Sequence, residues 1–209
     1  MSENSEQSID PGSVQLWAYD ATDHDSIGTR SIGFWLYMMS DAMIFAALFA
    51  AHGTYLHNYA GGPTAQDVIH FTGAAWETLF LFASVLAYGF GMVALKRGSC
   101  TSVVKWLFVS FLLGIGFLLL EYQEFAGLAE IGAVPQRSGF LSDYWGIVLT
   151  HGLHVFFGLL WMLVMIIQVM SEGFSRNVVG RLLTLKQFWH FQAVIWVCVF
   201  TFVYLMGGL

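Results

Sequence analysis

The sequence has little charge for its length. Eight of its 209 residues are Lys or Arg and 14 are Asp or Glu, so charged residues make up 11% of the chain. A typical soluble domain carries about 25%. Hydrophobic residues make up 57%, and the mean hydropathy is +0.66. Because a soluble surface needs charged groups, this shortage excludes an ordinary soluble domain and indicates a protein whose solvent is lipid.

Basic residues are scarcer still, and they form no basic patch. This excludes a nucleic-acid-binding role. The first 25 residues contain six acidic residues and no Lys or Arg. We therefore predict an acidic, flexible or surface-bound N-terminal arm over residues 1–29. It has no basic start followed by an apolar core, so we do not expect a signal peptide.

Cysteine is also rare, with Cys100 and Cys198 the two examples. Cys100 falls in a predicted loop, whereas Cys198 falls inside an apolar segment. The two are expected at different membrane depths, which argues against a disulfide between them. We interpret both as small packing residues.

Five apolar segments are long enough to cross a bilayer, since a transmembrane helix needs about 20 mostly apolar residues. They cover residues 32–56, 71–95, 104–128, 144–170 and 188–206. Short polar segments separate them. We predict an all-α fold, an integral membrane bundle of five transmembrane helices, in one domain over residues 30–209.

The few basic residues predict the orientation, because cytoplasmic loops collect Lys and Arg. Seven of the eight fall on the side of the bundle where the first span begins. They are Arg30, Lys96, Arg97, Lys105, Arg176, Arg181 and Lys186. Only Arg137 falls on the other side. We therefore predict a cytoplasmic N-terminus and a periplasmic C-terminus.

Several ionisable residues fall inside the predicted spans, where each costs about 2.5–3.5 kcal/mol on insertion scales. Asp41 lies about 14 Å into the first span, close to mid-membrane. The others lie toward the outer third of the membrane: Glu77, Glu121, Glu124, His151 and His154, with His52 at the end of the first span. A carboxylate–histidine cluster that bridges spans two to four would satisfy them.

Three interpretations of this cluster stay open. Carboxylate–imidazole hydrogen bonds could tie the helices together, the groups could conduct or buffer protons, or they could hold a metal. A di-iron bundle needs Glu-x-x-His on two helices, and this spacing is missing, so the metal interpretation is the weakest. His190 is interpreted as an interfacial hydrogen-bonding residue. Tyr144 and Tyr204 near span ends fit an aromatic belt.

Several longer motifs together are more specific than the span pattern and the buried ionisable residues. They are Gly-Phe-Trp-Leu-Tyr-Met-Met-Ser-Asp at 33–41, Ala-Gly-Gly-Pro-Thr at 60–64, Arg-Ser-Gly-Phe-Leu-Ser at 137–142, Thr-His-Gly-Leu-His-Val at 150–155, Phe-Trp-His-Phe at 188–191 and Val-Tyr-Leu-Met-Gly at 203–207. In sequence and order they resemble subunit III of the haem-copper respiratory oxidases. The resemblance is strongest to the cytochrome bo-type ubiquinol oxidase subunit III, and it covers nearly everything after residue 28.

The resemblance implies a role for several residues. Asp41 matches the family's buried first-span carboxylate, His151 and His154 match the paired histidines, and His190 matches the histidine of Trp-His-Phe. Relatives usually have an Asp three residues later, where this chain has Ala193. A role tied to that Asp, such as a buried polar contact in the fifth span, is therefore not expected here.

The resemblance also implies a complex in a bacterial inner membrane. Haem and copper would lie in the partner subunit I, subunits II and IV would complete a proton-pumping ubiquinol oxidase, and this multi-pass chain would carry no cofactor or metal. It would support subunit I by packing, by binding phospholipid and by sustaining proton uptake. Lipid headgroups are expected at Lys96, Arg97, Arg176 and Arg181.

Three alternatives predict different observations. A subunit III of a cytochrome c oxidase would differ in the electron donor. A stand-alone channel or transporter would need a substrate path through its own helices. A membrane di-iron enzyme would hold metal in the isolated chain.

Overall fold

The computed structural model describes residues 26–69 and 71–207. The helices are α1 (Ser26–Tyr55), α2 (Ala65–Val68), α3 (Phe71–Lys96), α4 (Cys100–Glu130), α5 (Gly139–Glu172) and α6 (Arg176–Val199). A 3₁₀ turn, η2 (Pro135–Arg137), precedes α5, and a π-helical turn, η3 (Phe200–Leu205), continues α6. Within these residues, five helices are long and apolar enough to span a membrane. The predicted all-α bundle of five spanning helices is confirmed.

The helices are longer than the predicted spans. The main difference is at α6, which begins at Arg176 rather than near residue 188. The side chain of Ser175 caps its first turn by accepting a hydrogen bond from the Val178 amide at 3.3 Å, and Leu182 and Leu185 are buried. A polar segment that was expected to be a loop therefore packs as an amphipathic helical extension. The predicted arm over 1–29 lies largely outside the described residues.

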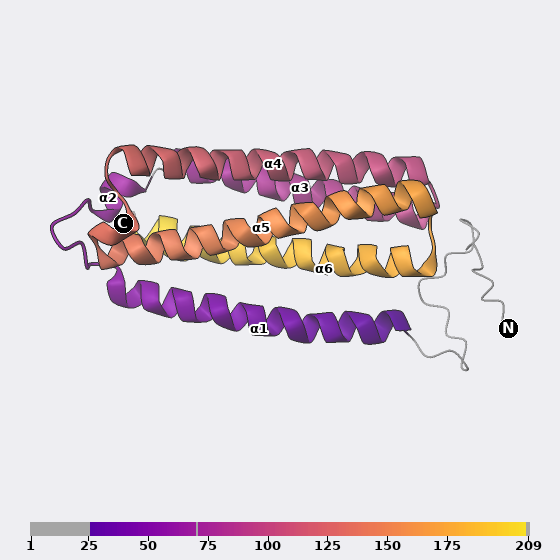
Figure 1. Cartoon of the computed structure of the whole chain (residues 1–209), viewed down its shortest axis with the longest axis horizontal. Helices are drawn as coiled ribbons and strands as arrows, with labels where there is room; N and C mark the ends of the chain where they lie inside the picture. The colour runs from indigo at the N-terminus through magenta and orange to yellow at the C-terminus, as the bar shows by residue number, and fades with distance from the viewer. Residues whose placement is uncertain (1–25, 70, 208–209) are drawn as a thin grey trace.

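The long helices run side by side, with two distinct ends (Figure 1). At one end, on the left, lie α2 and the ends of α1 and η3; we call it the α2 end. At the other lie the α3–α4 and α5–α6 turns, with most of the Lys and Arg residues of the described chain; we call it the basic end. Both the beginning of α1 and the end of α5 lie at the basic end, so these two helices are antiparallel.

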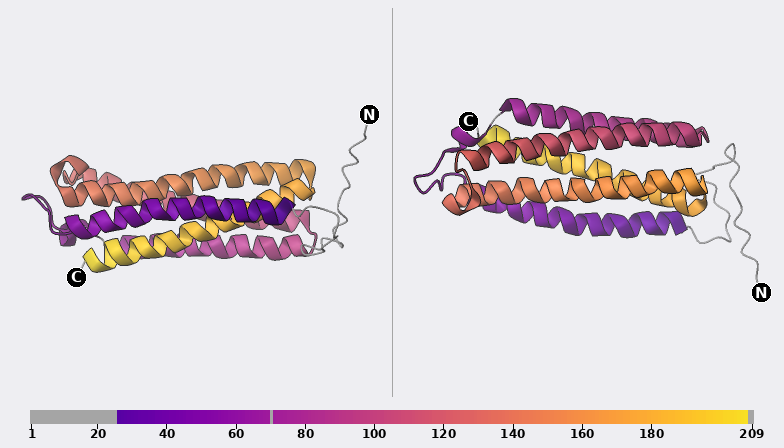
Figure 2. Two further views of the ribbon diagram at one scale, coloured as in Figure 1. Left: turned by 90° about the horizontal axis from the view of Figure 1, so that it is seen from below. Right: turned by 45° about the horizontal axis from the view of Figure 1, so that its top comes forward.

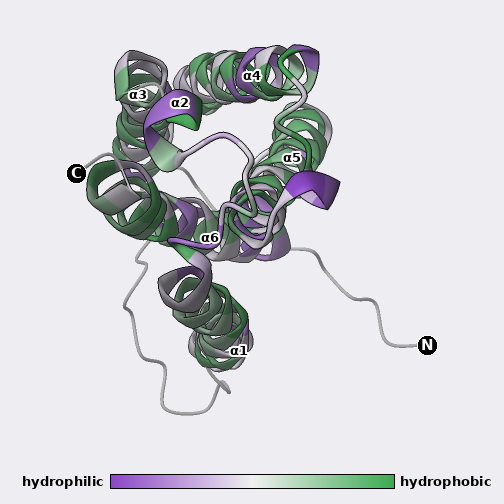
Figure 3. Ribbon diagram, turned by 90° about the vertical axis from the view of Figure 1, so that its left-hand side faces the viewer, coloured by the Kyte–Doolittle hydropathy of each residue, from purple (hydrophilic) through white to green (hydrophobic). Residues whose placement is uncertain are grey.

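Four helices form a closed group, since α3 packs on α4, α4 on α5, α5 on α6, and α6 on α3. Helix α1 lies outside this group, against α5 and α6, as the end-on view shows (Figure 3). A view from another side shows α1 running over the α5–α6 pair (Figure 2). Most of the α1 side chains outside this contact are exposed.

A polar contact joins α3, α4 and α6 between the middle of the four-helix group and the basic end. The hydroxyls of Ser84 (α3) and Ser110 (α4) each donate to the other residue's carbonyl oxygen, at 2.7 and 2.8 Å. The indole N–H of Trp189 (α6) donates to the Ser84 hydroxyl at 3.1 Å. Gly114 and Gly158 leave room for this indole, because a Cβ there would lie 3.2 and 2.8 Å from it. All of these polar groups are satisfied among themselves.

Candidate functional site: buried ionisable groups between the helices

The structure buries most of the ionisable residues predicted for the spans. The exposed fractions are 6% for Asp41, 1% for Glu77, 4% for Glu121 and 0% for His151, while Glu124 and His154 are half-buried. They do not form one carboxylate–histidine cluster. The structure divides them into Asp–His pairs that join α1 to α5, and an acidic group inside the four-helix group.

Asp41 pairs with His154. The distance between His154 Nε2 and Asp41 Oδ1 is 3.1 Å. His154 Nδ1 lies 2.6 Å from the carbonyl oxygen of Thr150, and because a carbonyl only accepts, Nδ1 carries a hydrogen. Nε2 is then the nitrogen that faces the Asp41 carboxyl. His154 was grouped from the sequence with the carboxylates of the other spans. In the structure, His154 instead faces Asp41 of α1 near the middle of the bundle.

A second pair joins the same two helices nearer the α2 end. His52 Nδ1 lies 2.6 Å from Asp143 Oδ2, and both side chains are more than nine-tenths buried. Sequence reasoning missed Asp143, which fell in a predicted polar loop but lies in the second turn of α5. We refer to Asp41–His154 and His52–Asp143 together as the double Asp–His latch.

The latch has a regular spacing that the sequence contains. Asp41 and His52 are 11 residues apart on α1, and Asp143 and His154 are 11 residues apart on α5. Eleven residues make about three helical turns, so the two residues of each helix share one face. Because α1 and α5 are antiparallel, the Asp of each helix meets the His of the other. This equal spacing was the signal that could have identified Asp143.

The acidic group consists of Glu77 on α3 and Glu121 and Glu124 on α4. Tyr144 donates to Glu124 Oε1 at 2.5 Å, and Tyr204 lies 3.2 Å from the same oxygen. The carboxyl group of Glu77 lies next to that of Glu124, and one buried oxygen of each has no hydrogen-bond partner. The two tyrosines, expected in an aromatic belt, are fully buried and hold Glu124 instead.

The π-helical turn η3 carries Tyr204. A π-helical turn contains one more residue than an α-helical turn, so it changes which side chains face the interior and is frequent at functional sites. Tyr204 is 0% exposed and lies 3.2 Å from the Tyr144 hydroxyl. Here η3 directs this phenol toward Glu124, from a helix that would otherwise continue as α6.

Glu121 lies against the backbone of α5. A Cβ added to Gly152 would lie 2.3 Å from Glu121 Oε1, so an alanine there would force the Glu121 carboxyl to move. The neighbouring His151 does not pair with this carboxyl; its Nε2 donates to the carbonyl oxygen of Gln192 at 3.2 Å. The His151 ring packs against Trp196, with ring centroids 5.1 Å apart. The predicted glutamate–histidine hydrogen bond is therefore not formed directly.

Of the residues predicted toward the basic end, the four lipid-headgroup candidates lie there, whereas His190 lies 14 residues into α6, beside Trp189. His190 Nδ1 donates to the carbonyl oxygen of Lys186 at 2.8 Å, and Arg181 donates to Gln168 at 3.1 Å. Ala193, at the family's usual Asp position, is buried in α6. The lipid-headgroup candidates are all exposed: Lys96, Arg97, Arg176 and Arg181.

Metal and thiol chemistry have few ligands available. Over residues 26–69 and 71–207, no group of three or more His, Cys, Asp or Glu is placed to hold a metal ion. Cys100 and Cys198 are free thiols. Cys100 is the first residue of α4, and its Sγ lies 3.6 Å from the Val169 carbonyl oxygen.

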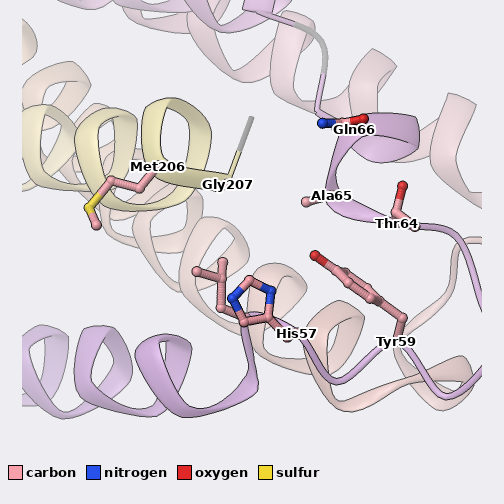
Figure 4. A pocket seen from close by; sticks show the side chains of 8 residues that line it. His57, Tyr59, Thr64, Ala65, Gln66, Met206 and Gly207 are labelled. Carbon is pink, nitrogen blue, oxygen red and sulfur yellow. The ribbon is translucent and has the colours of Figure 1, made fainter. Parts of the chain in front are cut away.

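A pocket of about 290 Å³ opens at the α2 end. Its lining residues are Leu56, His57, Tyr59, Thr64, Ala65, Gln66, Met206 and Gly207. Figure 4 shows them on the segment after α1, on α2 and at the end of η3. None of these residues carries a carboxylate or belongs to the latch or the acidic group. We interpret it as a surface depression among loops rather than as a binding site.

No family model matches the chain, but curated proteins do. Cytochrome bo(3) ubiquinol oxidase subunit 3 of Pseudomonas putida is 45% identical over 186 residues, which are 89% of this chain and 90% of that protein. Cytochrome c oxidase subunit 3 of a Bacillus species is 34% identical over 178 residues, which are 85% of this chain and 86% of that protein. Quinol oxidase subunit 3 of Bacillus subtilis is 31% identical over 84% of this chain and 86% of its own length.

Proposed function

Since the chain belongs to the family of subunit III of the haem-copper quinol oxidases, we propose that it is the accessory subunit III of a proton-pumping ubiquinol oxidase in a bacterial inner membrane. The observation that carries this proposal is the 45% identity to a ubiquinol oxidase subunit 3 along 89% of the chain. In this proposal, subunit I holds the haems and copper, and subunits II and IV complete the complex. The chain itself performs no redox chemistry.

The second candidate is a subunit III of a cytochrome c oxidase. The observation that favours it is the 34% identity to a protein of that name. This identity is lower than the 45% to the ubiquinol oxidase subunit, which supports the quinol assignment. The two candidates predict different electron donors for the same complex, so turnover with ubiquinol and with reduced cytochrome c distinguishes them.

The first contribution that we propose for the chain is packing. Helix α1 touches the bundle through α5 and α6, and the double Asp–His latch supplies its buried polar contacts to α5. Each Asp–His contact is made between groups that would otherwise be unpaired in hydrocarbon, where an unpartnered polar group is costly. We assign Asp41 and His154 to holding α1 in place; a proton-relay role at Asp41 is the competing interpretation.

The two interpretations of Asp41 give different mutant behaviour. Asp41→Asn keeps a hydrogen bond to His154 but cannot carry a proton. If the pair is structural, the purified complex with this substitution turns over and pumps protons as the wild type does. Slowed turnover in a fully assembled complex would instead support the relay.

The second proposed contribution is lipid binding at the basic end. Lys96, Arg97, Arg176 and Arg181 are exposed there, next to helix termini, where anionic headgroups attract Lys and Arg by about 1 kcal/mol each. The same excess of positive charge supports a cytoplasmic position for this end. Replacing Lys96 and Arg97 with Gln should reduce the anionic phospholipid that co-purifies with the complex. Unchanged lipid content would contradict the assignment.

The main proposal is tested by affinity purification of the chain from native membranes in mild detergent. The purified sample is examined by a reduced-minus-oxidised absorption spectrum and by ubiquinol-driven oxygen uptake. Haem bands together with quinol oxidase activity support the proposal. A colourless sample without activity, from membranes that do oxidise ubiquinol, would contradict it and would favour a stand-alone transporter.

A further inference from the structure

Buried polar atoms without a hydrogen-bonding partner are concentrated in one part of the bundle. Of nine such side-chain atoms in the described residues, seven belong to the same five residues: Glu77, Glu121, Glu124, His151 and Gln192. These residues come from all four helices of the α3–α6 group. Native proteins leave few buried polar groups unpartnered, and bound water commonly satisfies those that the protein does not. Their concentration here therefore needs an explanation.

These residues follow one another along the bundle and form what we call the polar column. At the α2 end, Tyr204 and Tyr144 contact Glu124, which lies next to Glu77. Glu121 comes one turn earlier on α4 and lies against Gly152. The residue before Gly152 is His151, which is bonded to Gln192. From Tyr204 to Gln192 the column is about 18 Å long, at 1.5 Å per residue.

The column is closed toward the basic end. One turn beyond Gln192 lies Trp189, whose indole fills the space left by Gly114 and Gly158. The indole N–H is satisfied by Ser84, and Trp189 is 0% exposed. This contact contains no unpartnered polar atom. Toward the α2 end, in contrast, Glu124 is only half-buried.

The charges in the column limit how its protons are arranged. Tyr144 from α5 and Tyr204 from η3 face Glu124, and no Lys or Arg among the described residues is hydrogen-bonded to any of the three carboxyls. Like charges at this separation oppose each other's ionisation, and burial adds several kcal/mol for each ion. Glu124 is the carboxyl that accepts from the tyrosines, so a negative charge is best stabilised there. A charge on Glu124 opposes a second charge on Glu77 or Glu121, so these two carboxyls hold protons.

Hydrogen-bonding partners are mismatched at the middle of the column. Both oxygens of Glu121 are unpartnered, so a proton on this carboxyl has no acceptor within the protein. His151 donates through Nε2, so Nδ1 of the neutral ring is an acceptor without a donor. The amide of Gln192 adds one donor group and one acceptor, both without partners. Water, which donates and accepts, complements all three.

We propose that the polar column is a hydrated proton-binding site, with water as its bound ligand and protons held on Glu77 and Glu121. Internal water completes the hydrogen bonds of Glu121, His151 and Gln192. Protons enter and leave past Glu124 at the α2 end, and the Trp189 contact blocks passage to the basic end. The column therefore holds protons from one side of the membrane and does not conduct them across it. This inference does not depend on the electron donor or on the identity of the partner subunits.

Infrared spectroscopy tests the protons. In the purified complex that contains this chain, protonated buried carboxyls give C=O stretching bands that are separate from carboxylate bands and shift in D₂O. Glu121→Gln and Glu77→Gln should each remove one such band. If both variants assemble and neither loses a band, the carboxyls are not proton-bearing and the proposal is wrong.

Hydroxyl-radical footprinting of the wild-type complex tests the water without any substitution. Radiolysis of bound internal water oxidises the side chains beside it. Trp196, which packs on His151, should be oxidised several-fold faster than Trp189, and both indoles are 0% exposed. Trp189 is the matched control because its surroundings are fully satisfied. Equal protection of the two tryptophans would overturn the hydrated column.

Discussion

The double Asp–His latch predicts a specific pattern of mutational coupling between α1 and α5. Asp41 is 8% and His154 25% exposed as side chains. Asp41→Leu replaces the carboxylate with an apolar side chain of similar size and leaves His154 Nε2 without a partner. A hydrogen bond to a charged group contributes about 1.5–3 kcal/mol. Because His154 is one-quarter exposed, we expect a loss near the lower end, about 2 kcal/mol.

The partner substitutions complete the cycle. His154→Leu should cost about the same as Asp41→Leu, about 2 kcal/mol, because each removes the same contact and leaves one group unpartnered. The double variant should cost little more than either single one, since replacing both partners removes the unpaired group. The resulting coupling energy is about 1.5–2 kcal/mol. Asp41→Asn should cost less than about 0.5 kcal/mol, because its amide N–H can donate to His154 Nε2.

The assay is unfolding of the purified protein in mixed micelles with increasing SDS, followed by tryptophan fluorescence. Ser40→Ala on the same helix is the control: its hydroxyl is exposed and bonds to the Tyr37 carbonyl within α1, so its effect should stay within about 0.5 kcal/mol. Additive effects of the two Leu substitutions, with coupling below about 0.5 kcal/mol, would refute the latch as an energetic link between α1 and α5.

Two further predictions concern Gly152 and the loop at the α2 end. Gly152→Ala should destabilise the protein by about 1–3 kcal/mol, because the new Cβ would lie 2.3 Å from Glu121 Oε1. Gly146→Ala is the control and should not destabilise it, because nothing lies within 4 Å of a Cβ there. Equal thermal stability of the two variants would contradict the contact. Hydrogen bonds from Thr64 to Asp67 lower the pKa of the Asp67 carboxyl. The stabilisation of α2 is therefore complete above the carboxyl's ordinary pKa near 3.8 and is lost as the pH falls through its lowered pKa. Amide exchange at α2 followed against pH should show this loss, and the Asp67→Asn variant should lack it.

The sequence predicts the number of spans well because each span is a long apolar run, and lipid leaves helices as the simplest way to satisfy the backbone. It predicts helix ends poorly. The first turns of α6 contain Arg181 and Lys186 on the outside and Leu182 and Leu185 on the inside. Their hydropathy is therefore low on average, although one face is buried. A search for helical periodicity, rather than for apolar length, would have found this extension.

The buried residues could be identified from the sequence, but their partners could not all be assigned. Spacing within one helix shows which residues share a face, but not which neighbouring helix that face meets. His154 was therefore predicted to join the acidic group, whereas in the structure it contacts Asp41 of α1. The position of Tyr204 depends on the π-helical turn, which changes the helical register without a proline or glycine to mark it. The 11-residue spacing that pairs His52 with Asp143 was present, and it becomes informative once α1 and α5 are known to be antiparallel neighbours.

We propose that this chain is a cofactor-free subunit of a haem-copper quinol oxidase. Native mass spectrometry of the complex, purified through a tag on its haem-containing subunit, tests this proposal. We predict one copy of a 23.3-kDa subunit in the intact assembly, and release of that subunit on activation without haem or copper. An assembly that lacks this subunit, or a released 23.3-kDa chain that retains haem or copper, would contradict the claim.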